Sequence, residues 1–392
     1  MGSVYASYYG LLSMIVPFNK PYMTGDEFAY IKQSHEHSQL AGDGPFTKEC
    51  HKWIETTTGS AKALLSHSCT AALEMSALLM NIEPGDEIIM PSYTFVSTAN
   101  AFALRGGVPV FVDIRGDTLN LDECLLEEAI TSKTKAIVPV HYAGVACEMD
   151  AILDIASRYG LWVVEDAAQG MMAKYKGRAL GSIGDLGAYS FHETKNVISG
   201  EGGALVVNNS DFVLSAEIIR EKGTDRSQFF RGNVDKYTWQ SLGSSFLPGE
   251  LIAAFLWAQL QHATEITRAR LESWNYYHAQ FASLAETGVI ARPIIPNQCE
   301  HNGHMYYLVL RDDICRSTLL SFMSERGVNA VFHYVPLHTS PAGMKYSRAC
   351  GDLDKTTRLS QQLIRLPLWV GLTTTEQDYV CACVCDAIAA QC

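Results

Sequence analysis

The sequence lacks three things: an apolar run long enough to cross a membrane, an excess of basic side chains and a regular cysteine spacing. A membrane-spanning helix needs about 18 consecutive apolar residues. The 30 Lys and Arg residues against 42 Asp and Glu residues give a formal net charge of −12, whereas non-specific nucleic-acid binding requires clustered basic side chains. We therefore expect neither a membrane nor a nucleic acid as partner. The 11 cysteines follow no disulfide pattern, which favours a protein of the reducing cytoplasm.

The composition is that of an ordinary globular protein. Hydrophobic residues make up 47% and charged residues 18% of the 392 residues, which predicts one large or two ordinary domains. Residues 1–13 lack the basic start and the cleavage site of a signal peptide, and we interpret them as an extension or an added leader. Cys381, Cys383 and Cys385 alternate in a helix-like segment without facing ligands, so we predict no metal site there.

Short apolar strands alternate with helical patterns between residues 60 and 255. The strand-like stretches are 86–91, 107–114, 135–142 and 161–167, and the helical ones are 70–80, 121–130 and 149–160. Alternation with short connections predicts an α/β fold, a largely parallel sheet with helices on both faces. Ligands bind such sheets beyond the carboxyl ends of the strands, so we expect the chemistry just after residues 163–165 and 137–140.

The pattern changes after residue 250. Residues 251–286 give one helical pattern of more than 30 residues, in which aromatic side chains at helical spacing indicate packing. A strand-like 305–311, a helical 317–327, a strand-like 328–336 and a terminal helix follow. We therefore predict a large domain over residues 14–255, and a bridging helix with a small α+β domain over residues 256–392.

Two local patterns have both a structural and a chemical interpretation. The stretch VVEDAAQG (163–170) places Asp166 directly after a strand and Gln169 one turn further on. A carboxylate there can hold a cationic ring nitrogen, although an Asp in that position is also a common N-cap. The stretch SHSCTAAL (66–73) opens a helix with small polar residues, where free N–H groups and the helix dipole hold a phosphate. Capping by Ser68 or Thr70 explains the second pattern equally well.

Lys195 lies between SFHET and the glycine-rich GEGGA at 200–204. An isolated lysine usually faces solvent, whereas one that forms a Schiff base must lose its proton near neutral pH, which burial and nearby positive charge favour. The glycines would let the backbone turn closely behind a bound ring. Together with Asp166 and the helix start at 68–70, Lys195 supplies the three groups that pyridoxal phosphate (PLP) needs.

Several stretches, in chain order, resemble the sugar-nucleotide aminotransferases of the DegT/DnrJ/EryC1/StrS family: PSYTFVSTANA, PVFVDI, PVHYAGVACEMD, VVEDAAQG, SFHETKN, EGGALVVNN and REKGTDRSQFFRG. The resemblance runs from about Val16 to near the C-terminus. It implies the PLP-dependent transferase fold of the aspartate-aminotransferase type I. It also implies a homodimer with its sites at the subunit interface.

By position, the resemblance assigns roles around the cofactor ring. Lys195 matches the Schiff-base lysine, Asp166 the partner of the pyridine nitrogen and Gln169 the residue beside the ring hydroxyl. Phe95 falls where family members stack an aromatic side chain on the ring.

The phosphate site is matched with departures. Ser190 matches a phosphate-binding serine, and Cys69 and Thr70 fall where a Gly-Thr pair binds the phosphate, so Cys69 offers its main-chain N–H. Many family members carry G-Y-N-Y-R-M where the neighbouring subunit lends an Asn to the phosphate. This chain has GSSFLP there, with Ser245 at the Asn position and Leu247 at the Arg position.

Other residues are candidates for contact with a sugar nucleotide. His141, His333 and His338 lie near predicted strand ends, where a histidine is more often a structural hydrogen bonder. Arg226 and Arg231 lie in the polar segment GTDRSQFFRG, which fits a diphosphate contact and a solvated surface equally well.

The resemblance implies transamination of a dTDP-4-keto-6-deoxyhexose with L-glutamate as donor, for cell-surface polysaccharide such as O-antigen or enterobacterial common antigen. We expect Lys195 to move the proton between substrate carbon and cofactor. A galacto product is favoured, and a gluco product or amination at C3 stays open. Related sugar dehydratases carry a histidine in place of this lysine. A non-enzymatic DNA-binding regulator on the same fold is disfavoured by the net charge of −12.

Overall fold

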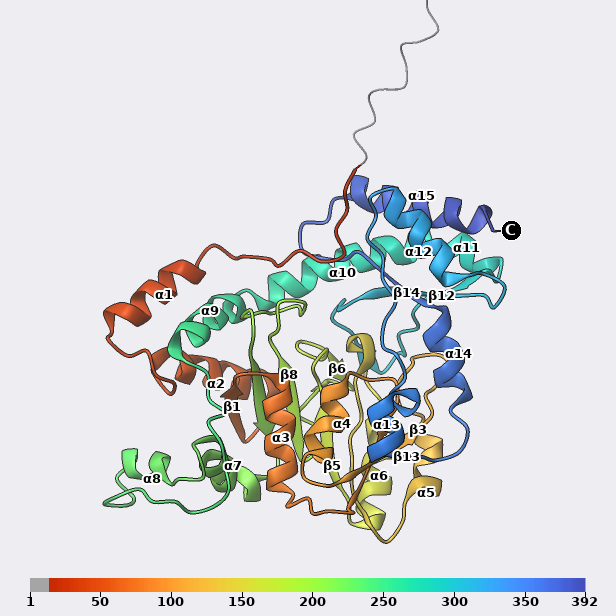
Figure 1. Cartoon of the computed structure of the whole chain (residues 1–392). Helices are drawn as coiled ribbons and strands as arrows, with labels where there is room; N and C mark the ends of the chain where they lie inside the picture. The colour runs from red at the N-terminus through yellow and green to blue at the C-terminus, as the bar shows by residue number, and fades with distance from the viewer. Residues whose placement is uncertain (1–13, 392) are drawn as a thin grey trace, which may run out of the picture.

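A large sheet with helices on both faces forms the lower body in Figure 1, and a smaller body lies above it. The computed structural model describes residues 14–391, so the extension predicted at 1–13 lies outside the described residues. The strand order of the large sheet is β1-β9-β8-β5-β4-β2-β3-β13. Neighbouring strands are parallel except where β9 takes part. The expected α/β fold with a largely parallel sheet is therefore confirmed.

The strands of this sheet follow the predicted apolar stretches closely. They are β1 (Lys62–Ser66), β2 (Glu87–Pro91), β3 (Val108–Val112), β4 (Thr134–Ile137), β5 (Trp162–Asp166), β8 (Leu186–Ser190), β9 (Gly203–Val207) and β13 (Arg348–Ala349). The strand predicted over 135–142 is shorter, since β4 ends at Ile137. Pro139 has no N–H for a ladder, and the chain turns at Ala143, whose φ is 58°.

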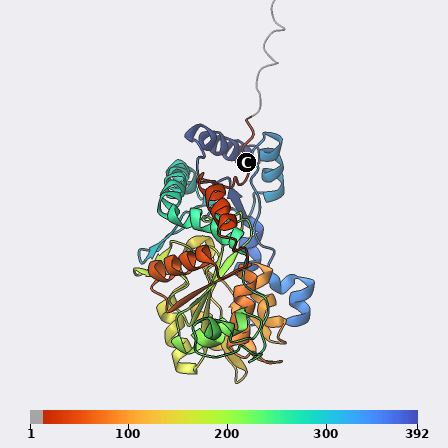
Figure 2. The same ribbon diagram turned by 90° about the vertical axis from the view of Figure 1, so that its left-hand side faces the viewer.

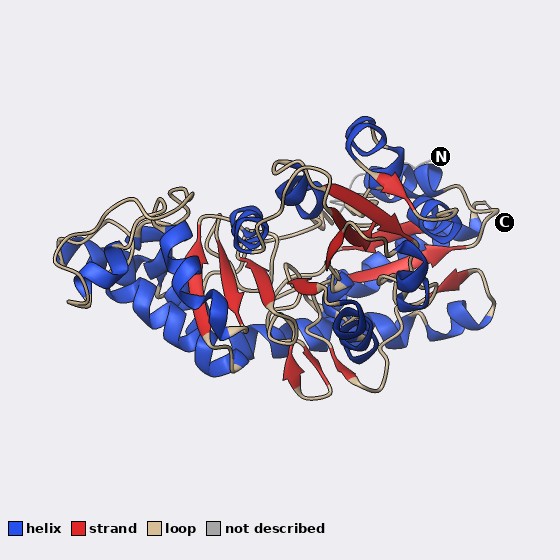
Figure 3. Ribbon diagram, turned by 90° about the horizontal axis from the view of Figure 1, so that it is seen from below, coloured by secondary structure: helices blue, strands red, loops and turns tan. Residues whose placement is uncertain are grey.

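Helices cover both faces of the large sheet, as Figure 3 shows from below. The helices of this half of the chain are α1 (Glu27–Glu36), α2 (Pro45–Thr58), α3 (Cys69–Leu79), α4 (Val96–Ala103), α5 (Leu126–Ala129), α6 (Met149–Tyr159), α7 (Val213–Arg220), α8 (Arg226–Phe230) and α9 (Glu250–Gln261). Adjacent strand residues point to opposite faces. Ile88 therefore packs with α3 and α4, and Ile89 with α5 and α6.

The smaller body is built on a three-stranded antiparallel sheet, β10-β12-β14, and Figure 2 shows it above the large sheet. Its strands are β10 (Ile290–Ala291), β12 (Tyr306–Leu310) and β14 (Leu363–Leu366). Its helices are α10 (Ala263–Gln280), α11 (Ala282–Glu286), α12 (Arg316–Glu325) and α15 (Thr374–Ala389). The remaining elements are α13 (Pro341–Tyr346), α14 (Asp354–Gln362) and a small sheet of β6 (Lys174–Tyr175), β7 (Arg178–Ala179) and β11 (Cys299–Glu300).

Two predictions for this half of the chain were wrong. The single helix over 251–286 is three helices, because the backbone leaves helical geometry at His262 (ψ 12°) and Phe281 (ψ 8°). Its aromatic side chains do pack as expected, with Trp274 and Tyr277 buried in the core of the smaller body. The strand predicted over 328–336 makes only isolated bridges, one of them between Val331 and Arg365.

The two bodies share segments of the chain. Val16 pairs with Val328 and lies in the core of the smaller body. In the other direction, β13 extends the large sheet beside β3, and Leu337 packs into the core of the large body. The domain boundary at residue 255 therefore stays a prediction. A segment near the N-terminus packs in the smaller body, and segments after residue 255 pack in the large body. Within residues 14–391, no helix is both long and apolar enough to span a bilayer.

Candidate active site

A cavity of about 730 Å³ opens at the carboxyl ends of the parallel strands. Asp166 at the end of β5 and Ser190 at the end of β8 line its floor, with the first residues of α3 and α4. Residues 331–334 and Arg365 of β14 line it from the smaller body. The crevice expected from the strand pattern is therefore present, at the junction of the two bodies.

Asp166 is held in one orientation by a chain of hydroxyl groups. The Thr98 hydroxyl donates to Asp166 Oδ2 over 2.7 Å, and the main-chain N–H of Ala168 donates to Oδ1 over 3.1 Å. Because the Thr98 proton is used there, the Thr94 hydroxyl donates to Thr98 over 2.8 Å. Only 5% of Asp166 is exposed, so this carboxylate is fixed before any ligand binds.

The start of α3 presents hydrogen-bond donors to the same cavity. Ser68 caps the helix by accepting from the N–H of Ala71 over 3.0 Å. The N–H groups of Cys69 and Thr70, in the first turn, have no intrahelical partner, and the positive end of the helix dipole adds to their affinity for an anion. The Thr70 hydroxyl lies 2.7 Å from that of Ser97. Burial raises the pKa of the Cys69 thiol, so its side chain stays neutral.

Lys195 lies in the turn after β8, where its N–H donates to the carbonyl of His192 over 2.9 Å. Its side chain lines the cavity, and burial lowers the pKa of its amine. One of the glycines at 200–204 makes room for the start of α3, a role that the sequence did not indicate. A Cβ on Gly203 would lie 2.4 Å from the main-chain N of Cys69. The glycine thus clears room for the start of α3, and Gly202 lines the cavity itself.

Gln169 and Phe95 complete the predicted ring contacts. Gln169 accepts from the N–H of Ala143 over 2.7 Å and donates to the Tyr334 hydroxyl over 3.0 Å. Phe95 is 56% exposed at the start of α4 and lines the cavity. Floor and wall therefore combine a carboxylate, an amine, an amide and an uncovered aromatic face.

The sequence profile of the DegT/DnrJ/EryC1/StrS aminotransferase family matches residues 21–385. The chain belongs to this family. The expected family and the α/β type I fold are thereby confirmed, and the chain is an aminotransferase that depends on PLP.

Individual relatives cover nearly the whole chain. The spore coat polysaccharide biosynthesis protein SpsC of Bacillus subtilis is 32% identical over 383 residues, 95% of this chain and 97% of that protein. The aminotransferase TlmJ from Streptoalloteichus hindustanus superposes with a TM-score of 0.88 at 26% identity, covering 96% of this chain and all of that one. DesV from S. venezuelae superposes with a TM-score of 0.84 at 28% identity, covering 93% and 94%.

The residues of this aminotransferase fit PLP. A buried, hydroxyl-fixed carboxylate at Asp166 suits a protonated pyridine nitrogen, and the open N–H groups at the start of α3 suit a phosphate. Ser190 is buried beside them, and its hydroxyl accepts only a long contact of 3.4 Å from the N–H of His192. The amine of Lys195 lies in the same cavity with a lowered pKa. The predicted cofactor residues are thus brought together, apart from Ser245.

His141 does not line this cavity, and the idea that it contacts substrate is corrected. Its ring is fully buried. Nδ1 accepts from the N–H of Cys147 over 3.2 Å, so Nε2 carries the proton and donates to Glu165 over 2.8 Å. Both ring nitrogens are therefore used within the protein.

The other two histidines differ from each other. His333 lines the cavity, stacks on Tyr334 with ring centroids 3.7 Å apart, and lies 2.7 Å from the Tyr142 hydroxyl. His338 lies outside the cavity lining, 2.7 Å from the Ser92 hydroxyl. Substrate contact stays a prediction for His333, and the structure gives His338 a structural hydrogen bond instead.

Arg226 and Arg231 line a second cavity of about 600 Å³, not the one that holds Lys195. Arg226 pairs with Glu221 over 2.5 Å, and Arg231 pairs with Glu217. The prediction that Arg226 and Arg231 contact the substrate in the cavity of their own chain is therefore wrong. Ser245 also lies outside the first cavity and is exposed, so its predicted contact across a subunit interface stays a prediction.

Sequence reasoning missed several residues that shape the site. Thr98 and Ser97 lie inside α4, and no local pattern in the sequence indicates that Thr98 donates a hydrogen bond to Asp166 or that Ser97 contacts Thr70. Tyr334 was passed over in a segment predicted to be a strand. Three further residues reach the cavity from distant parts of the chain and have no sequence signal of their own: Arg270, His304 and Arg365.

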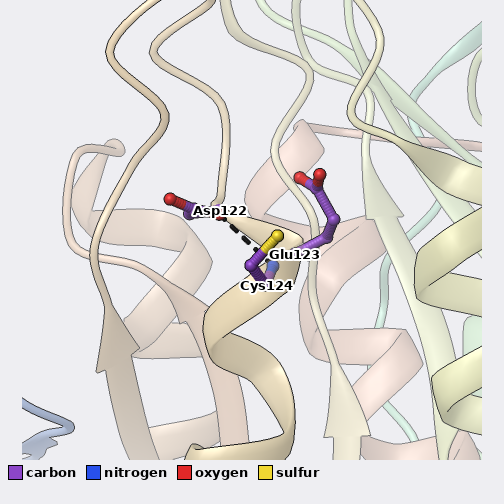
Figure 4. Close-up of side chains that lie close together, drawn as sticks. All are labelled: Asp122, Glu123 and Cys124. Carbon is purple, nitrogen blue, oxygen red and sulfur yellow. Dashed lines mark hydrogen bonds between the residues drawn. The ribbon is translucent and has the colours of Figure 1, made fainter.

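One group of potential metal ligands occurs among residues 14–391, and it lies apart from the cavity: Asp122, Glu123 and Cys124. Figure 4 shows the two carboxylates pointing apart. Asp122 pairs with Lys355 over 3.0 Å, and Glu123 pairs with Arg115 over 2.7 Å. These partners already balance both carboxylates, so the group carries no metal assignment.

Proposed function

We propose that the protein transfers the amino group of L-glutamate to a dTDP-4-keto-6-deoxyhexose, giving a dTDP-4-amino-4,6-dideoxyhexose for cell-surface polysaccharide. One observation carries the proposal: in a chain of this family, the Lys195 amine, the Asp166 carboxylate and the start of α3 meet in one cavity. The galacto product is favoured, because DKYTW, GSS and FHYVPLH resemble dTDP-4-amino-4,6-dideoxygalactose transaminase. The relative SpsC is also named for polysaccharide biosynthesis.

PLP supplies an electron sink that stabilises negative charge on the carbon that loses its proton. The residues of the chain prepare this step. Asp166 would keep the ring nitrogen protonated, and its own position is fixed by Thr98. The open end of α3 together with Ser190 would hold the phosphate. Lys195 would hold the aldehyde end of the cofactor, and its Nζ is the group that would accept and return the proton at the substrate carbon.

Burial prepares Lys195 for that role. The amine must be neutral to accept a proton, and burial lowers its pKa. His304 and His333 line the same cavity as Lys195, and burial also lowers the pKa of both rings.

Two alternatives differ only in the sugar. The gluco product at C4 and amination at C3 require the same cofactor residues. The face of the sugar presented to Lys195 decides between galacto and gluco at C4, and the position of the keto group decides between C3 and C4. Dehydration without transamination is disfavoured, because this chain has Lys195 where the dehydratases have histidine. A homodimer with shared sites and a cytoplasmic location belong to the proposal and rest on the family resemblance and on the unpatterned cysteines.

The decisive experiment is incubation of the holoenzyme with L-glutamate and each keto-sugar nucleotide, with product stereochemistry determined by NMR. We expect the C4 galacto amine as the main product. Lys195→Ala should abolish turnover while PLP still binds through Asp166 and α3. Full transamination by this variant, or a wild-type protein that is colourless and cannot be reconstituted, would refute the proposal.

A further inference from the structure

Two guanidinium groups line the cavity, and neither pairs with a carboxylate among residues 14–391: Arg270 and Arg365. An unpaired cation in a partly buried site is unfavourable unless a ligand supplies the negative charge. The cofactor's own anionic requirements are met elsewhere, by the start of α3. The two arginines therefore point to a second anionic group in the same cavity.

Arg270 is occupied with the protein itself. It is 4% exposed, and its Nε and Nη2 donate to the carbonyls of Gly303 and His304, the latter over 2.6 Å. These bonds hold the turn that places His304 beside the cavity. Arg270 thus serves mainly to position the backbone.

Arg365 is anchored so that one edge of its guanidinium stays open. Its main chain exchanges two hydrogen bonds with Val331, of 3.1 and 2.7 Å. Its Nε and Nη2 donate to the carbonyl of Phe332 over 3.3 and 3.2 Å, and the group lies 4.8 Å from the centroid of the Phe18 ring. Nη1 and the second Nη2 proton remain, and within the described residues they have no partner. Two adjacent N–H groups in a plane match the two oxygens of a carboxylate.

Arg365 and Lys195 line the same cavity, together with His304 and His333. Burial lowers the pKa of the Lys195 amine, and the positive charge of Arg365 lowers it further. A ligand group bound by Arg365 is therefore near the carbon that reacts at Lys195. In an α-amino acid the carboxylate is attached to that very carbon. In the sugar nucleotide the diphosphate is attached to C1, on the far side of the ring from C4.

We propose that Arg365 is the carboxylate-binding residue of the amino-donor subsite, holding the α-carboxylate of the amino acid beside Lys195. This assignment rests on the proposed function, because it needs an amino-acid donor. It makes Arg365 a specificity-determining residue for the donor and not for the sugar nucleotide. The planar guanidinium offers two parallel N–H donors to the two carboxylate oxygens. The ammonium group of lysine supplies the charge without this pair of donors, so lysine replaces Arg365 only in part.

The two half-reactions separate donor from acceptor. In the first, the PLP form of the holoenzyme is mixed with L-glutamate, and the cofactor absorbance is followed. In the second, the aminated cofactor form is mixed with the keto-sugar nucleotide. For Arg365→Gln we expect the apparent dissociation constant for L-glutamate to rise about 10- to 100-fold, the effect of losing a charged hydrogen-bonded pair, with the second half-reaction within about threefold of wild type. Arg365→Lys should be intermediate.

A matched control lies beside the same segment. The guanidinium of Arg316 lies over the Phe332 ring, 5.5 Å from its centroid, but Arg316 does not line the cavity. Arg316→Gln removes the same charge from the same neighbourhood and should leave both half-reactions unchanged. An amine without a carboxylate, such as benzylamine, should react with wild type and Arg365→Gln at equal rates. Calorimetric binding of glutarate, an unreactive dicarboxylate, gives a readout independent of turnover and should weaken only in the Arg365 variants.

The outcomes distinguish this inference from the proposed function. If wild type fails to react with any amino acid, the proposed function fails. If wild type reacts with L-glutamate and Arg365→Gln reacts equally well, only the donor subsite is refuted. A loss confined to the keto-sugar half-reaction would instead assign Arg365 to the diphosphate and also overturn the inference.

Discussion

Replacing Glu165 with glutamine tests how the protein fixes the end of β5. The Glu165 carboxylate is fully buried and directly precedes Asp166. Oε2 accepts from His141 Nε2 and from the N–H of Gly181, both over 2.8 Å. Oε1 accepts from the N–H groups of Ile183 and Gly184 over 2.6 and 2.7 Å. Four donors thus converge on one carboxylate, and all belong to segments that meet at this point of the sheet.

The magnitude follows from counting the donors that glutamine cannot accept. An amide has one oxygen, so its NH2 group must face two of the four donors. His141 cannot relieve this by moving its proton, because Nδ1 already accepts from Cys147. Two charge-assisted hydrogen bonds are lost, at about 1.5–3 kcal/mol each. Glu165→Gln should therefore lower the free energy of unfolding by about 3–6 kcal/mol.

Denaturant unfolding followed by far-UV circular dichroism measures this effect. The control is Glu300→Gln, since the Glu300 side chain is 64% exposed and lies 3.7 Å from Lys174. The control substitution should change the free energy of unfolding by no more than about 0.5 kcal/mol. Because Asp166 is the next residue, we also expect weaker PLP retention in Glu165→Gln. An unfolding midpoint equal to that of wild type would show that these four contacts do not fix the strand.

Three further predictions concern separate parts of the chain. Thr98→Val removes the donor to Asp166 Oδ2 and should weaken PLP binding about 10-fold in an absorbance titration; unchanged affinity would contradict the hydroxyl chain. Burial lowers the folded-state pKa of His304 well below 6.5, so the unfolded chain binds the extra proton below about pH 6.5 and stability should fall as the pH drops from there. His304→Asn should flatten that slope in denaturation series, and an equally steep slope would exclude it as the source. Hydrogen bonds from Ser317 and Thr318 lower the pKa of exposed Cys315 to about 7, while Glu123 raises the pKa of exposed Cys124. Iodoacetamide at neutral pH should therefore modify Cys315 before Cys124, and peptide mapping with the reverse order would contradict this.

The cofactor end of the site could be predicted from the sequence because its residues sit on local patterns. Asp166 ends an apolar strand, and the crevice rule places such a residue at the mouth of a parallel sheet. The helix start at Ser68 needs only a short polar turn before an apolar helix. Lys195 gained its meaning from the family resemblance, since nothing in its own spacing separates it from a surface lysine.

The substrate end could not be predicted, because it is assembled by contacts between distant segments. Arg365 lies on β14 and is held beside Val331 by two main-chain hydrogen bonds, and this isolated bridge is the pairing that the segment predicted as a strand over 328–336 makes with β14. His141 follows an apolar stretch just as Asp166 does. Its side chain is buried against Glu165 instead of facing the cavity, and the sequence does not show that β4 already ends at Ile137. The prediction of one helix over 251–286 was wrong because the breaks occur at His262 and Phe281. Neither is Gly or Pro, so the sequence gives no sign of them.

The division between the two ends of the cavity has a functional consequence. The groups that fit PLP come from the sheet edge and from α3 and α4, and they are fixed by bonds within the large body, such as Thr98 to Asp166. The open guanidinium of Arg365 and the ring of His333 come from the smaller body and line the same cavity. Substitutions in the first set should therefore change cofactor retention for every substrate. Those in the second set should change the choice of donor or sugar while cofactor affinity stays constant.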